Sequence, residues 1–66
     1  MFTQYAPLGD RLRRAAVSRG FSAASIEMKQ TGQGRHVVTD TASGSWLEFD
    51  TAGWRVRVIG SGKKEA

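Results

Sequence analysis

Apolar residues between positions 8 and 19 recur at helical spacing. In the segment LGDRLRRAAVSR, Leu8, Leu12 and Ala16 are four residues apart and share one face. Pro7 suits the first helical turn, where its missing N–H would be unpaired in any case. Gly20 can adopt the left-handed conformation that ends a helix, with Phe21 folding back on Ala16. The pattern predicts an amphipathic helix from residue 8 to residue 19.

The second half of the chain contains one turn sequence twice. DTASG at 40–44 leads to Trp46, and DTAG at 50–53 leads to Trp54. Turns rich in Asp, Thr, Ser and Gly between short apolar segments are typical of hairpin connections. The repeat therefore predicts a meander of three antiparallel strands, at about 35–40, 45–50 and 54–59.

The register of each hairpin follows from keeping apolar side chains on one face, because a one-residue slip moves every side chain to the other face. For the first turn we expect three cross-strand pairs: Val38 with Leu47, Thr39 with Trp46, and His36 with Phe49. For the second turn we expect five: Phe49 with Trp54, Leu47 with Val56, Ser45 with Val58, Glu48 with Arg55, and Trp46 with Arg57. Trp54 would then lie in the core beneath the helix, and Trp46 would lie exposed on the opposite face, beside arginines.

Residues 22–31 fit two structures. Ile26 and Met28 alternate with Glu27 and Lys29, which favours a strand. Ser22 could instead cap a short helix that ends before a glycine, and residues 8–31 would then look like a helix-turn-helix. The predicted fold is α+β, with one N-terminal helix packed on a three- or four-stranded antiparallel β-meander. The predicted organisation is an N-terminal arm at 1–6, one domain at 7–60 and a flexible basic tail at 61–66.

Composition limits how the protein can be stabilised and what it can bind. The 66 residues include no cysteine and one histidine, so neither a disulfide framework nor a zinc staple is expected. A chain this small depends on a few large side chains or on association, and homodimerisation is one such route. Ten basic residues oppose six acidic ones, for a net charge of +4, which favours an anionic partner. No signal peptide and no membrane span is recognisable, so we expect a soluble, cytoplasmic protein without a membrane partner.

Enzymatic chemistry has little support in the sequence. His36 is the single histidine, and a nucleophilic site would need it beside a serine and an orienting carboxylate. Asp40 and Asp50 fall in turns, where they have a local structural role. No cluster of ligands with metal-binding spacing occurs. We therefore expect no enzyme activity, no cofactor and no metal.

The candidate binding residues are aromatic and basic. Stacking and phosphate contact need an aromatic surface interleaved with basic groups. The same residues could instead form cross-strand pairs or an interface with a protein, and a solvated helix face would also account for the helix arginines. The candidates are Trp46, Arg55, Arg57, Arg35 and Lys29 on the sheet, Arg11, Arg13 and Arg14 on the helix, and Lys63 and Lys64 in the tail.

Two short stretches are similar to known families. GSWLEFDTAGWRVRV at 44–58 resembles the Trp hairpin of the arm-type DNA-binding domains of tyrosine recombinases, where the helix follows the sheet instead of preceding it. GSGKKEA at 60–66 is similar to the start of the last helix in double-stranded-RNA-binding domains. In size and architecture the chain also resembles phage-encoded inhibitors, including anti-CRISPR proteins. Neither stretch assigns the chain to a family.

The leading functional hypothesis is a small, non-enzymatic nucleic-acid-binding module that uses a basic and aromatic sheet face together with an arginine-rich helix. The alternative is a protein-binding inhibitor of the anti-CRISPR kind, which docks on an acidic surface of a host complex. Both hypotheses use the same side chains, and they differ in whether the partner is a nucleic acid or an acidic protein surface.

Overall fold

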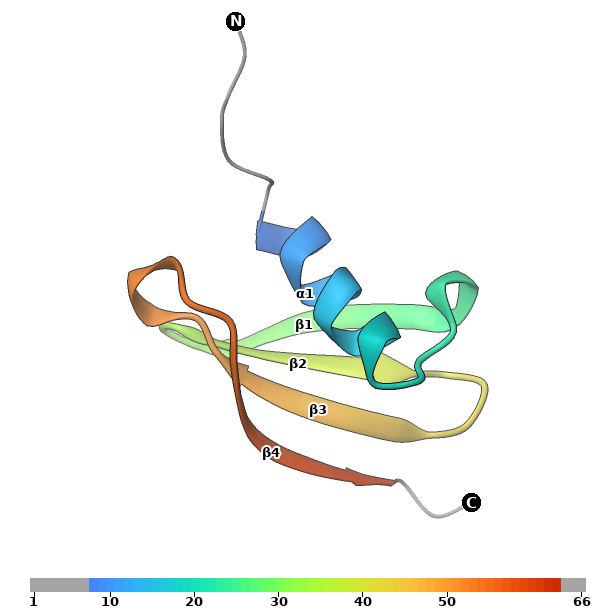
Figure 1. Cartoon of the computed structure of the whole chain (residues 1–66). Helices are drawn as coiled ribbons and strands as arrows, with labels where there is room; N and C mark the ends of the chain where they lie inside the picture. The colour runs from blue at the N-terminus through green and yellow to red at the C-terminus, as the bar shows by residue number, and fades with distance from the viewer. Residues whose placement is uncertain (1–7, 64–66) are drawn as a thin grey trace, which may run out of the picture.

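The computed structural model describes residues 8–63, except for the side chain of Trp54. One helix lies across one face of a four-stranded antiparallel sheet, with strand order β1-β2-β3-β4 (Figure 1). The α+β prediction is confirmed, and the sheet has the larger of the two predicted strand numbers. The predicted arm at 1–6, Pro7 and the residues from Lys64 onward lie outside the described residues. The elements are α1 (Leu8–Ser18), the 3₁₀ turn η1 (Ala23–Ser25), β1 (Ile26–Gly32), β2 (Arg35–Asp40), β3 (Ser45–Asp50), the 3₁₀ turn η2 (Ala52–Trp54) and β4 (Arg57–Lys63).

The C-terminus of α1 has the predicted glycine cap. Gly20 has a φ of 100°, which a residue with a Cβ adopts only with strain. The N–H of Phe21 donates to the carbonyl of Ala16 at 3.1 Å, and the N–H of Gly20 donates to the carbonyl of Val17 at 3.0 Å. These two hydrogen bonds define a Schellman motif. The motif turns the chain sharply so that Phe21 packs against the core.

Residues 26–32 form a strand, so the strand interpretation of this segment is confirmed. Only Ala23–Ser25 are helical, as a single 3₁₀ turn. Met28 is on the helix side of the sheet, because its Cε lies 3.8 Å from the position that a Cβ on Gly9 would occupy. Glu27 and Lys29 therefore lie on the opposite side, as their alternation with Ile26 and Met28 predicts.

The core lies between α1 and the sheet. Phe49, Leu12 and Val38 are the largest fully buried side chains, and α1 packs closest to β2. Burial of apolar surface is the main source of stability, at roughly 25 cal/mol per Å², so these few side chains hold α1 in place. The buried apolar residues are Leu12, Ala16, Val38, Leu47 and Phe49, with Leu8, Ala15, Phe21, Ile26, Val56 and Val58 partly buried around them.

The repeated Asp-Thr-Ala sequence forms the same local structure twice. Asp40 Oδ1 accepts the N–H of Ala42 at 2.9 Å, and Asp50 Oδ1 accepts the N–H of Ala52 at 3.1 Å. In each turn the Asp side chain thus bonds its own backbone two residues on. The N–H of the following Thr donates to a backbone carbonyl earlier in the chain, Thr41 to Ser25 and Thr51 to Gly34, both at 2.8 Å. The prediction that both Asp-Thr-Ala segments form turns is confirmed.

The two hairpins nevertheless differ in register. The first has the predicted pairs: Val38 with Leu47, Thr39 with Trp46, and His36 with Phe49. The second prediction was wrong, since β4 begins at Arg57 and the chain uses η2, Arg55 and Val56 as connection. A register shift between Glu48 and Phe49 changes the alignment further. The observed pairs are Asp50 with Arg57, Phe49 with Val58, Glu48 with Gly60, Leu47 with Ser61, Trp46 with Gly62 and Ser45 with Lys63.

The longer connection follows from a contact with another turn of the chain. The N–H of Thr51, just after β3, donates to the carbonyl of Gly34 in the turn between β1 and β2, which ties this part of the connection to that turn. Gly53, with a φ of 67°, then reverses the chain. Because β4 extends to Lys63, Ser61–Lys63 belong to the sheet and not to the predicted flexible tail. The predicted core position of Trp54 concerns a side chain outside the described part of the structure.

Candidate functional site

Two surfaces of the protein carry the predicted binding residues. We call the sheet face turned away from α1 the open face. We call the solvent-facing side of α1, together with Arg19, which follows the helix, the helix surface. Cross-strand pairing places on the open face Glu27, Lys29, Thr31, Arg35, Val37, Thr39, Trp46, Glu48, Asp50 and Arg57. The helix surface holds Asp10, Arg11, Arg13, Arg14, Val17 and Arg19.

Trp46 lies on the open face but not beside the predicted arginines. Its cross-strand neighbours are Thr39 and Gly62. A Cβ added to Gly62 would lie 2.7 Å from Cζ2 of the indole, and one added to Gly60 would lie 3.7 Å from Cζ3. The ring thus covers the glycine backbone of β4, and Trp46 is half-buried rather than exposed. The predicted Trp46–Arg57 and Glu48–Arg55 pairs are wrong because β4 enters the sheet two residues after Arg55.

The basic residues of the open face lie among acidic ones. Arg35 Nη1 is 3.8 Å from Glu48 Oε2. Asp50 is the cross-strand neighbour of both Arg35 and Arg57. Lys29, Arg35 and Arg57 oppose Glu27, Glu48 and Asp50, so three basic and three acidic residues share this face. The open face is therefore balanced in charge, which the sequence prediction of a basic platform did not anticipate.

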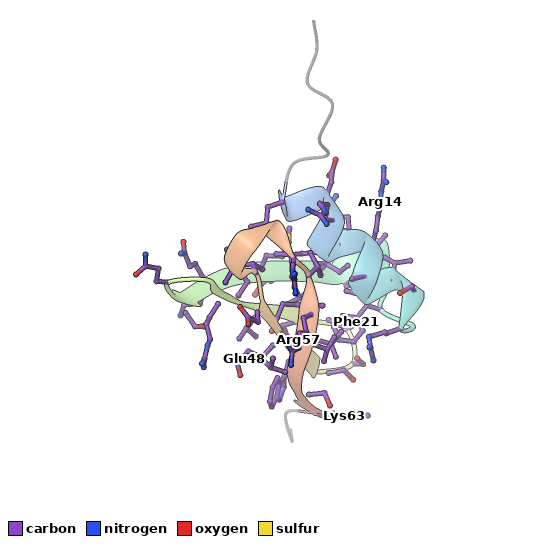
Figure 2. The ribbon with its side chains drawn as sticks, turned by 60° about the vertical axis from the view of Figure 1, so that its left-hand side comes forward. Arg14, Phe21, Glu48, Arg57 and Lys63 are labelled. Atoms are coloured by element: carbon purple, nitrogen blue, oxygen red, sulfur yellow. The ribbon has the colours of Figure 1, made fainter. Side chains whose placement is uncertain are left out.

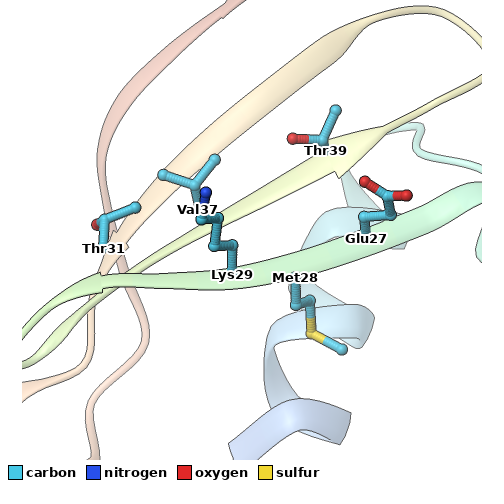
Figure 3. Close-up of a pocket in the computed structure, with 6 residues that line it drawn as sticks. All are labelled: Glu27, Met28, Lys29, Thr31, Val37 and Thr39. Carbon is cyan, nitrogen blue, oxygen red and sulfur yellow. The ribbon is translucent and has the colours of Figure 1, made fainter.

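A shallow hollow occupies the β1–β2 half of the open face. Glu27, Lys29, Thr31, Val37 and Thr39 line it on this side, while Met28 points to the α1 side of β1 (Figure 3). Its volume is about 410 Å³. Both apolar and charged groups border it.

Most of the excess positive charge of the described residues lies on the helix surface. Arg13, Arg14 and Arg19 are exposed, and Arg11 is half-buried on the flank of α1. Four arginines here oppose one acid, Asp10. Figure 2 shows Arg14 projecting from α1, at the other end of the molecule from Glu48 and Lys63. The structure thus separates the predicted binding residues into a basic group on the helix and a balanced group on the sheet.

The remaining candidates are scattered. Arg55 is exposed in the connection before β4, and Lys63 is exposed at the end of β4. Lys64 lies outside the described residues. The residues that sequence reasoning missed are Gly60 and Gly62, whose backbone supports the indole of Trp46. Their spacing of two in IGSGK indicates a strand face without side chains, and this signal was available in the sequence.

The titratable groups of the turns have structural partners. Asp40 is buried, and its carboxylate accepts hydrogen bonds from the N–H groups of Ser22 and Ala42. These bonds, above all the one from Ser22, hold the pKa of the carboxyl below the usual value of 3.8. His36 Nδ1 lies 3.2 Å from the hydroxyl of Thr51. Within residues 8–63, no group of three or more His, Asp or Glu side chains is arranged to hold a metal ion.

Comparison with protein-family models, with curated proteins and with solved structures finds no match for this chain. Across the described residues, no helix has the length and apolar character needed to cross a membrane.

Proposed function

We propose that this protein is a small, non-enzymatic nucleic-acid-binding module whose helix surface contacts the phosphate backbone. The observation that carries the proposal is the position of the charge: four arginines and one aspartate on and just after α1, against a balanced open face. Each phosphate that a basic side chain neutralises releases condensed counterions, which is the main source of nonspecific affinity for nucleic acid.

Arginine suits this role for a geometric reason. Its planar guanidinium presents paired N–H donors that match two phosphate oxygens at once. Arg13 and Arg14 are exposed on the solvent side of α1, so neither has to leave a buried position to reach a phosphate. Arg19, just beyond the helix, extends the same basic surface. Contact with duplex backbones through these residues would be largely independent of sequence.

The open face supports a second candidate, an inhibitor or adaptor that binds a protein. This face combines balanced charge, a hollow of about 410 Å³ and the half-buried indole of Trp46. Such a mixture is more typical of a protein interface than of a surface for a polyanion. If the open face binds a protein, Trp46→Ala should weaken binding to that protein by about 2 kcal/mol or more, with little dependence on salt.

Fluorescence anisotropy with labelled duplex DNA, single-stranded DNA and duplex RNA tests the proposal. We expect affinity in the micromolar range or tighter at about 50 mM salt for at least one polymer, falling steeply at about 200 mM salt. Arg13→Ala should weaken binding and lower the slope of log K against log salt by about one. No binding to any of the three polymers at about 50 mM salt, where nonspecific attraction is strong, would reject the proposal and favour the protein-binding candidate.

A further inference from the structure

Among residues 8–63, no strand pairs with the outer edge of β1. The strand order places β1 and β4 at the two sides of the sheet. Six of the seven residues of β1 are exposed, and Met28 keeps 37% of its surface exposed. An edge strand presents backbone N–H and C=O groups that can pair with another strand. The outer side of β1 is thus a candidate for strand addition.

We propose that two copies of this chain associate through β1, in antiparallel register about a two-fold axis at Met28. The interface joins two four-stranded sheets into one continuous sheet. The proposal concerns a surface on β1 and does not depend on nucleic-acid binding. Its occupant is a second copy because the charges of β1 are complementary to those of the same strand turned by 180°.

Parity limits where the axis can lie. Residues directly opposite each other in an antiparallel pair point to the same face. A two-fold axis perpendicular to the sheet keeps every side chain on its own face, so it must pass through a residue and not between two. With the axis at Met28, Glu27 lies opposite Lys29 of the second copy, and Lys29 lies opposite Glu27 of the second copy. Glu27 and Lys29 both project from the open face of β1 (Figure 3), so both charged pairs of the proposed dimer lie on that face.

Other positions of the axis lose this complementarity. An axis at Glu27 places Glu27 opposite Glu27 of the second copy, and an axis at Lys29 places Lys29 opposite Lys29 of the second copy. Like charges directly opposite each other are destabilising. An axis at Gln30 moves Glu27 opposite Gln33, which lies in the turn after β1. The alternating charges that would repel a shifted copy therefore select the register centred on Met28.

The helix side of the strand supports the same register. Met28 lies on this side, near Gly9 at the start of α1. With the axis at Met28, the two methionine side chains lie next to each other and cover surface that is exposed in the single chain. Because the axis preserves faces, both α1 helices lie on the same side of the joined sheet, and the two helix surfaces face one direction.

A single introduced cysteine tests the position of the axis. The chain contains no cysteine, and opposed Cα atoms in antiparallel strands lie about 4.5–5.5 Å apart, within the range that a disulfide spans. We expect Met28→Cys to form a covalent dimer on mild oxidation. The control is Ile59→Cys, on the opposite edge strand and similarly exposed at 42%, which should remain mainly monomeric. Equal cross-linking of both variants, or cross-linking of the control alone, would overturn the proposal.

Charge reversal tests the pairing without a covalent bond. Glu27→Lys and Lys29→Glu each oppose like charges twice in a homodimer, and each should raise the dimer dissociation constant about tenfold or more. An equimolar mixture of the two variants restores both opposite-charge pairs and should form a heterodimer. Sedimentation equilibrium of the full chain measures these constants, and circular dichroism checks that each variant folds. A wild-type chain that stays monomeric at about 1 mM, or reversals that leave the dissociation constant unchanged, would contradict the proposal.

Discussion

The helix surface and the open face carry similar numbers of charged residues but different charge balances. The helix surface has four arginines and one aspartate, whereas the open face has three basic and three acidic side chains. A net charge of +4 for the whole chain does not distinguish these surfaces. The location of charge, and not its total, therefore decides which surface suits a polyanion.

The two sides of the sheet also differ in what they contribute to stability, and the largest expected effect tests this difference. Phe49 is fully buried beneath α1, whereas Val37 is half-buried on the open face. Phe49→Ala should lower the free energy of unfolding by about 3–5 kcal/mol, because it leaves a cavity. Val37→Ala should lower it by less than about 1 kcal/mol.

Urea unfolding followed by circular dichroism measures both variants, with the shift in midpoint converted to free energy. Similar losses for Phe49→Ala and Val37→Ala would mean that the open face is covered in solution, and the division of the sheet into a core side and an open side would be wrong.

The packing of Trp46 on β4 gives the next largest effect. A Cβ at Gly62 would lie 2.7 Å from the indole, while the nearest atom to one at Gly60 is 3.4 Å away. Gly62→Ala should therefore destabilise the protein by about 1–2 kcal/mol, and Gly60→Ala should cost less. In a background with Trp46→Ala, the cost of Gly62→Ala should fall below about 0.5 kcal/mol, since the opposing ring is absent. A cost that stays unchanged in this double-mutant cycle would place Trp46 elsewhere.

A smaller effect is expected from the carboxyl of Asp40. Because its pKa is lowered in the folded protein, the ionised form contributes stability that is present above the pKa of the unfolded chain. This contribution is lost as the pH falls through the lower pKa of the folded state. Asp40→Asn keeps the Oδ1 acceptor but removes the charge, so its stability should depend less on pH below about 4 than that of the wild type. Thermal melts between about pH 2 and pH 7 measure this, and parallel curves for the two proteins would contradict it.

The helix and the first hairpin were predictable from the sequence because local patterns decide them. The spacing of Leu8, Leu12 and Ala16, with Gly20 after them, encodes both the helix and its end. In the first hairpin, a four-residue connection after Asp40 leaves one register that keeps Val38 and Leu47 on the same face.

The second hairpin was not predictable by the same argument. Keeping apolar residues on one face does not by itself decide the register, since Phe49 can face either Trp54 or Val58. The choice depends on the hydrogen bond from Thr51 to Gly34, which belongs to a different turn. The candidate site inherited this error: the wrong register placed Arg55 and Arg57 beside Trp46 and produced a basic platform that the structure does not contain.

The assignment of nucleic-acid binding to the helix surface is tested most directly by two variants of equal charge. Arg13→Ala/Arg14→Ala and Arg35→Ala/Arg57→Ala each remove two positive charges, one pair from the helix surface and the other from the open face. We would measure the affinity of both variants and of the wild type for labelled duplex DNA across a salt titration. We expect the helix variant to lower the slope of log K against log salt by about two, and the sheet variant to change this slope little. An equal decrease of this slope in both variants, or a decrease in the sheet variant alone, would contradict the assignment of nucleic-acid binding to the helix surface.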